Sequence, residues 1–160
     1  MSMDIFLKLD DVKGESTDKS HKDEIDIMSF SWGMAQSGTT HMGGGGGAGK
    51  VSVQDISITK FHDKASPLLS IACCTGKHYK QGLITFRKAG EKPLEYLKLK
   101  LEEVMITSVS HGGSGGDDRP TETVTLNFAK FTHTYTPQKP DGSGDAPVEQ
   151  IFNIAENNKE

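Results

Sequence analysis

Hydrophobic and polar residues alternate with a period of two along most of the chain. The alternating segments lie near residues 5–9, 24–36, 51–58, 84–87, 97–102, 123–128 and 148–154. This period is typical of strands that bury one face, and amphipathic strands favour antiparallel pairing. The pattern predicts a mainly β fold of about seven strands, arranged as a small antiparallel β-barrel or two-sheet sandwich.

The segment from Glu24 to Gln36 contains a change of phase. Ile25 and Ile27 share one face, after which the apolar positions shift by one residue to Met28 and every second residue beyond it. A shift of this kind predicts one long strand with a β-bulge near Ile27–Met28. Small residues take the other face of the second half: Ser29, Ser31, Gly33 and Ala35.

A segment at about 63–76 departs from the two-residue period. Pro67 suits the first turn of a helix, and Gly76 suits its end. Apolar residues between them fall at helical spacing. We expect one amphipathic helix that flanks the β-structure and contributes to the core.

Composition limits the classes of function. The 160 residues fit one domain, 1–160, on the usual scale of about 100–200 residues. The 18 basic and 22 acidic residues are spread along the chain, so no basic patch for nucleic acid is expected. No apolar run approaches the ~18 residues that span a bilayer, so no membrane insertion is expected. The adjacent cysteines Cys73 and Cys74 cannot join distant segments, which excludes a disulfide scaffold.

Two glycine-rich loops imitate catalytic motifs. Gly44–Lys50 has the G-x-x-x-x-G-K spacing of a phosphate-binding loop, but Val51 replaces the required hydroxyl residue and a strand follows instead of a helix. Gly112–Gly116 has the G-x-S-x-G spacing of a nucleophile elbow around Ser114, again without the helix that should follow. We interpret both as loops.

No other pattern points to an enzyme or a metal site. The histidines show no recognised ligand spacing; they are His21, His41, His62, His78, His111 and His133. The acidic residues form no carboxylate pair of the glycosidase type. The sequence therefore predicts no catalytic residue, no cofactor and no metal.

Many blocks of the sequence, in order, are similar to the Hcp family. These are the haemolysin-coregulated, tube-forming proteins of bacterial type VI secretion systems. The similar blocks cover nearly the whole chain: Lys13–His21, Asp23–Ile27, Ser29–Gly33, His41–Lys50, Val53–Ser57, Asp63–Pro67, Thr75–His78, Arg87–Gly90, Glu95–Leu97, Ser108–Gly113, Asp118–Arg119, Thr121–Ala129 and Tyr135–Gln138.

The resemblance implies a structural role. It implies a two-sheet β-barrel with a flanking helix and a ring of six identical subunits. The rings stack into a tube, a contractile sheath expels the tube beneath a spike trimer, and effector proteins travel in the lumen. It also implies export without a signal peptide, from the bacterial cytoplasm to the outside. Some members carry a C-terminal toxin domain; since this chain stops just after its last predicted strand, no toxin extension is expected.

Two sets of residues are candidates for contacts in such a tube. Small polar strand faces suit a lumen wall that contacts effectors, although an ordinary solvated outer face explains them too. These candidates are Ser29, Ser31, Gly33, Thr123, Thr125 and Asn127. The resemblance places the long glycine-rich loop at contacts between subunits or rings, the alternative being a loop without contacts. Its candidates are Thr40, His41, Met42, Gly43, Gly44, Gly45, Gly46, Gly47 and Lys50.

Two other classes stay open on the sequence alone. One is a secreted monomeric β-sandwich binding module, and the other is a hydrolase that uses Ser114.

Overall fold

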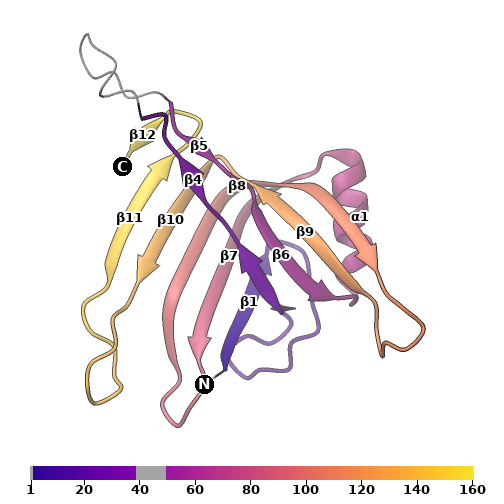
Figure 1. The fold of residues 1–160 in the computed structure, drawn as a ribbon, viewed down its shortest axis with the longest axis horizontal. Coiled ribbons are helices and arrows are strands. Elements are labelled where there is room, and N and C mark those ends of the chain that lie inside the picture. The colour runs from indigo at the N-terminus through magenta and orange to yellow at the C-terminus, as the bar shows by residue number, and fades with distance from the viewer. Residues whose placement is uncertain (1, 39–49) are drawn as a thin grey trace.

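The computed structural model describes residues 2–38 and 50–160, and within them the fold is mainly β (Figure 1). One helix, α1 (Ser66–Thr75), accompanies the strands. The strands are β1 (Met3–Leu9), β2 (Ile25–Ile27), β3 (Ser29–Ser31), β4 (Met34–Ala35), β5 (Ser52–Val53), β6 (Ile56–Phe61), β7 (His78–Lys88), β8 (Leu94–Gly112), β9 (Thr121–Asn127), β10 (Lys130–Tyr135), β11 (Val148–Asn153) and β12 (Asn158–Lys159).

Ten strands form one antiparallel sheet, and β4 and β5 form a second, two-stranded one. The main path of the large sheet runs β12-β11-β10-β8-β7-β1-β2, and a branch leaves β8 through β9 and β6 to β3. The prediction of a mainly β, antiparallel fold with a flanking helix is confirmed. Of the two predicted arrangements, the structure has the one with two sheets, because the sheets do not close into a barrel.

Strand β8 joins the branch to the rest of the sheet. Its first part pairs with β7 and β10, and its last part, from Met105 to Gly112, pairs with β9. A register shift between Ile106 and Ser108 accompanies the change of partner. The predicted segment 97–102 covers only part of this strand, because the residues after Ile106 are mostly small and polar and lack the apolar alternation.

The prediction of a single strand over 24–36 is wrong. The change of phase inside this segment marks a passage between two strands and not a β-bulge. The segment divides into β2, β3 and β4. Strand β2 pairs with β1, whereas β3 pairs with β6 on the branch. Met28, between them, donates its backbone N–H to the carbonyl of Thr59 at 2.8 Å. The apolar face changes sides here because the chain passes from one part of the sheet to the other.

Helix α1 is shorter at its start than predicted. Asp63 forms a turn before it, because the Asp63 carboxylate accepts the Ala65 N–H at 2.9 Å and the Asp63 N–H donates to the Ser66 hydroxyl at 3.0 Å. Gly76 ends the helix at a φ of 68°, where glycine is favoured. Leu69 and Ala72 face the core. Among the described residues no helix is long and apolar enough to cross a membrane.

The loop between β1 and β2 is held by charged and aromatic contacts. Arg87 donates to both oxygens of Asp18, at 3.0 and 2.5 Å, and its guanidinium lies 5.1 Å from the centre of the Phe6 ring. The His21 ring also stacks on Phe6, with the ring centres 4.3 Å apart, and its Nε2 is hydrogen-bonded to the Glu95 carboxylate at 2.6 Å. The Arg87 guanidinium holds the pKa of the Asp18 carboxyl well below its usual range.

We expect Asp18→Asn to lower the free energy of unfolding at pH 7 by about 1–2 kcal/mol, since it removes a partly exposed, two-point ion pair. Because the pKa of Asp18 is lowered in the folded state, its stabilisation is complete above the ordinary aspartate pKa of about 3.9 and is lost as the pH falls below it. Urea unfolding at several pH values measures the difference. The difference in the free energy of unfolding between the variant and the unmodified protein should become smaller in acid. The control Asp118→Asn lies in an exposed loop and should leave the free energy of unfolding nearly unchanged at every pH.

Candidate functional site

The branch of the sheet has one apolar and one polar face. Its strands β3, β6 and β9, with the end of β8, direct alternate side chains to opposite sides. Ile58 and Val124 are fully buried on the core side, and Phe30 of β3, which lies opposite Ile58, packs against the same core. The intervening side chains of each strand therefore point away from the core.

Two rows of hydroxyl side chains cross this outward face. The strand register aligns the first row as Ser29, Thr59, Thr123 and Ser110. It aligns the second row as Ser31, Ser57, Thr125 and Ser108. The serines of β3 and β8 are exposed, and the residues of β6 and β9 between them are half-buried. We call these two rows the hydroxyl surface.

A hydrogen-bonded cluster holds one end of the hydroxyl surface. The Asp55 carboxylate accepts from the Thr107 hydroxyl at 2.6 Å and from the Asn127 amide at 2.9 Å. The hydroxyl of Thr125 lies 2.7 Å from that of Thr107 and 2.6 Å from that of Ser108. These bonds fix side-chain rotamers where the second row meets the loop before β6.

The structure brings together most of the residues predicted for a lumen wall. Ser29 and Ser31 from β3 share one face with Thr123 and Thr125 from β9, although the sequence separates the two strands by about ninety residues. Asn127 lies at the edge, bound to Asp55. Gly33 lies outside the rows, between β3 and β4, where its carbonyl accepts the Gln54 N–H at 2.9 Å.

Sequence reasoning missed half of the hydroxyl surface. Ser57 and Thr59 alternate with buried isoleucines in β6, which is the same signal that identified β3 and β9. Ser108 and Ser110 gave a weaker signal, because Val109 is the only large apolar residue between Thr107 and Gly112.

The glycine-rich loop is described only at its base. The candidates Thr40, His41, Met42 and Gly43–Gly47 lie outside the described residues, and Lys50 is exposed just before β5. An apolar groove lies beside this base, between the β4–β5 pair and β10 and β11. It is lined by Met34, Val51, Val53, Phe131, Ile151 and Phe152, among others.

Ser114 has no histidine partner in the part of the chain that the structure describes. Its N–H and hydroxyl both donate to Asp117, at 3.0 and 3.2 Å, within an exposed turn. The nearby His111 instead directs Nδ1 to Glu122, at 3.0 Å. Among the described residues, no histidine is therefore placed to activate Ser114 as the base of a hydrolase triad would.

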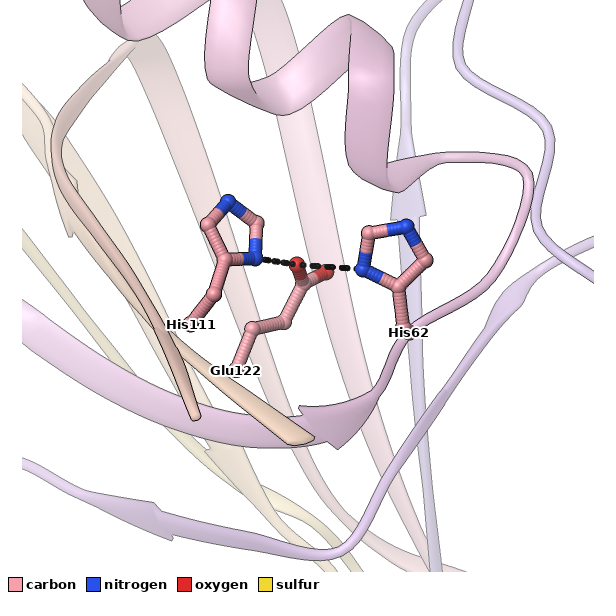
Figure 2. A group of neighbouring side chains, drawn as sticks. All are labelled: His62, His111 and Glu122. Carbon is pink, nitrogen blue, oxygen red and sulfur yellow. Dashed lines mark ion pairs between the residues drawn. The ribbon is translucent and has the colours of Figure 1, made fainter. Parts of the chain in front are cut away.

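A second group of side chains lies where the core meets α1. His62 follows β6, His111 belongs to β8 and Glu122 to β9, and Figure 2 shows both imidazoles directed at the Glu122 carboxylate. The donor atoms of the three lie within 4.8 Å of one another. The spacing of the histidines along the chain gave no sign of this, because strand pairing brings His62 and His111 together. These residues are of the types that bind transition metals.

A buried ammonium group lies behind this cluster. Lys60 and Glu122 are both buried, and Lys60 Nζ contacts Glu122 Oε1 directly. Lys60 Nζ also donates to Asp63 at 2.9 Å and to Ser66 at 3.1 Å. The start of α1 is therefore tied to β6 and β9 by a charged network inside the core.

Comparisons with known proteins agree with this fold. Residues 6–135 match the family model described as type VI secretion system effector, Hcp. The chain is 58% identical to protein hcp1 of Pseudomonas aeruginosa, over 98% of both chains. It resembles the structure of a type six secretion system protein with a TM-score of 0.93 and 29% identity, covering 99% of this chain and 100% of the other. It resembles the crystal structure of Hcp1 from Salmonella typhimurium with a TM-score of 0.83 and 36% identity, over all of both chains.

The family match over most of the chain defines a component of a bacterial secretion system. The chain belongs to the Hcp family of type VI secretion proteins. This is a family of secreted, structural proteins and not a family of enzymes.

We expect Lys60→Met to lower the free energy of unfolding by about 3–5 kcal/mol, because Glu122 would keep a buried charge without its partner. Urea unfolding followed by circular dichroism measures the loss. Lys130→Met, which removes an ammonium from partly exposed ion pairs, should have a much smaller effect. Adding Glu122→Gln to Lys60→Met should recover part of the stability; a double variant no more stable than the single one would contradict the explanation.

Proposed function

We propose that the chain is a subunit of a homohexameric ring, that the rings stack into the inner tube of a type VI secretion system, and that the hydroxyl surface lines the lumen. Membership of the Hcp family supports the tube role. The observation that carries the assignment of the lumen is the hydroxyl surface itself, which crosses four paired strands without a charged or bulky residue in its two rows.

A surface of this kind suits a wall that must hold effectors and release them. Serine and threonine hydroxyls both donate and accept hydrogen bonds, and they rotate to suit a partner. They lack the full charges that would select for one sign of effector surface. Their short side chains also leave the lumen wide. The apolar side chains on the opposite face of each strand keep the wall rigid, since they pack in the core.

Exposed apolar residues near the sheet edges are available for subunit contacts. Met34 and Val148 are exposed at 48% and 59%, and the apolar groove lies beside Met34. A ring that closes by rotation uses two different surfaces of each subunit, so the groove would receive a different part of the neighbouring copy. In this proposal the loop from Thr40 to Lys50 makes contacts between neighbouring subunits or rings.

The remaining partners follow from the tube role. A contractile sheath would surround the tube, and a spike trimer would lie at its end. The protein would reside in the bacterial cytoplasm before the sheath contracts and would leave the cell with the tube.

Electron microscopy of the purified protein tests ring formation. We expect rings with six-fold symmetry, in which each subunit buries its exposed apolar residues against a neighbour. Light scattering measures the mass in parallel. A species with the mass of one subunit, 17.3 kDa, at concentrations where rings should form would favour a monomeric β-sandwich binding module instead.

We expect Ser31→Gln to reduce the amount of a co-expressed type VI effector that co-purifies with the rings. The longer side chain would project from an exposed position of the hydroxyl surface and block the approach of an effector. Quantitative gel analysis of the purified complex measures retention, and microscopy confirms that the rings remain.

Ser114→Gln is the matched control, because it makes the same change at an exposed turn outside the hydroxyl surface. It should retain the effector at the level of the unmodified protein. Intact Ser31→Gln rings with unchanged retention would contradict the assignment of this surface to the lumen.

A further inference from the structure

The cluster of His62, His111 and Glu122 places electron-rich atoms around one point. His111 Nδ1 lies 3.0 Å from Glu122 Oε2, and His62 Nδ1 lies 3.7 Å from the same oxygen (Figure 2). Glu122 Oε2 is buried yet makes no hydrogen bond. A buried carboxylate oxygen without a hydrogen bond is costly, and here it faces two ring nitrogens.

The two oxygens of Glu122 have different surroundings. Oε1 is occupied, because Lys60 Nζ contacts it and the Ser66 hydroxyl donates to it at 2.6 Å. These bonds hold the carboxylate in place from the core side. They leave Oε2 directed at the imidazoles, where a cation would complete its coordination.

The His111 ring is oriented for a cation at Nδ1. Its other nitrogen, Nε2, lies 3.3 Å from the hydroxyl of Ser70 on α1. When Nε2 carries the proton and donates it to this hydroxyl, Nδ1 keeps a free lone pair 3.0 Å from Glu122 Oε2. A hydrogen bond of this kind, which fixes the ring and its tautomer, is the usual outer contact of a metal-binding histidine.

We propose that His62, His111 and Glu122 bind a divalent transition-metal ion of the zinc class, through the two Nδ1 atoms and Oε2. Two imidazoles and one carboxylate are a common zinc set, with water in the fourth position. Zinc bonds of about 2.0–2.2 Å place tetrahedral donors about 3.4 Å apart. The donors here lie within 4.8 Å, and the two imidazole side chains are 45% and 44% exposed, so rotation of the rings closes the site.

Nearby charges also permit a cation. Lys60 is a positive group next to the cluster, but Asp63 and Glu122 both contact it, so the three side chains together carry a net negative charge. The exposed rings give the ion access from solvent. The site lies on the core side of the branch, away from the hydroxyl surface, and its existence does not depend on the proposed tube.

Isothermal titration of Zn²⁺ into the untagged, chelator-treated protein tests the site. We expect one ion per subunit, and His62→Ala and His111→Ala should each weaken binding by at least about tenfold. His78→Ala, at an exposed position of β7, is the matched control and should bind zinc as the unmodified protein does. Circular dichroism confirms that each variant is folded.

Two further measurements identify the ligands. Crystals soaked in Zn²⁺ should show an anomalous peak among the three side chains. The Co²⁺-substituted protein should show no thiolate-to-metal charge transfer, which separates this site from binding at Cys73 and Cys74. Zinc binding that survives both histidine substitutions, a thiolate band, or no binding by the folded protein would overturn the proposal. The last result would leave the cluster as ion pairs between the two histidines and Glu122.

Discussion

The antiparallel ladder of β8 is the interaction on which the rest of the structure depends. It pairs with β7 and β10 along its first part and with β9 along its last part. The main path of the large sheet and its branch are therefore joined through this one strand. The bulge after Ile106 turns the end of β8 toward β9, and β9 then positions β6 and β3. The hydroxyl surface and the histidine cluster both require this turn, since each draws residues from β8 and β9.

The branch uses its two faces for different chemistry. Toward the core it carries isoleucine and valine, and near α1 it carries Lys60 and Glu122, a buried pair that cannot be split without leaving a charge inside the protein. Away from the core it carries hydroxyls. Because successive residues of a strand point to opposite sides, one short run such as Thr59–Lys60 contributes to both the outer surface and the inner network.

Much of the β-structure could be predicted from the sequence, and the reasons for the failures are physical. Alternation identified β6 and β9 because buried side chains alternate there with half-buried ones. It also located β1 and β11, although β1 buries three consecutive residues and β11 has none that is fully buried. It failed at β10, where His133 and Tyr135 continue the face of the buried Phe131 but remain exposed. It identified Ser29, Ser31, Thr123 and Thr125 as polar faces, but it could not show that they adjoin, because their distance depends on β6 pairing with both β3 and β9. The convergence of His62 and His111 was hidden for the same reason.

Between β2 and β3 the chain changes direction at Met28, and this change fixes the number of residues here more strictly than their identity. Ile25 and Ile27 point into the core on one side of Met28, and Ser29 and Ser31 point out of it on the other. One residue added or removed between them would exchange inner and outer side chains along β3, placing hydroxyls in the core and Phe30 on the outer surface. Related chains should therefore tolerate exchanges among small residues here far more readily than a change in the number of residues.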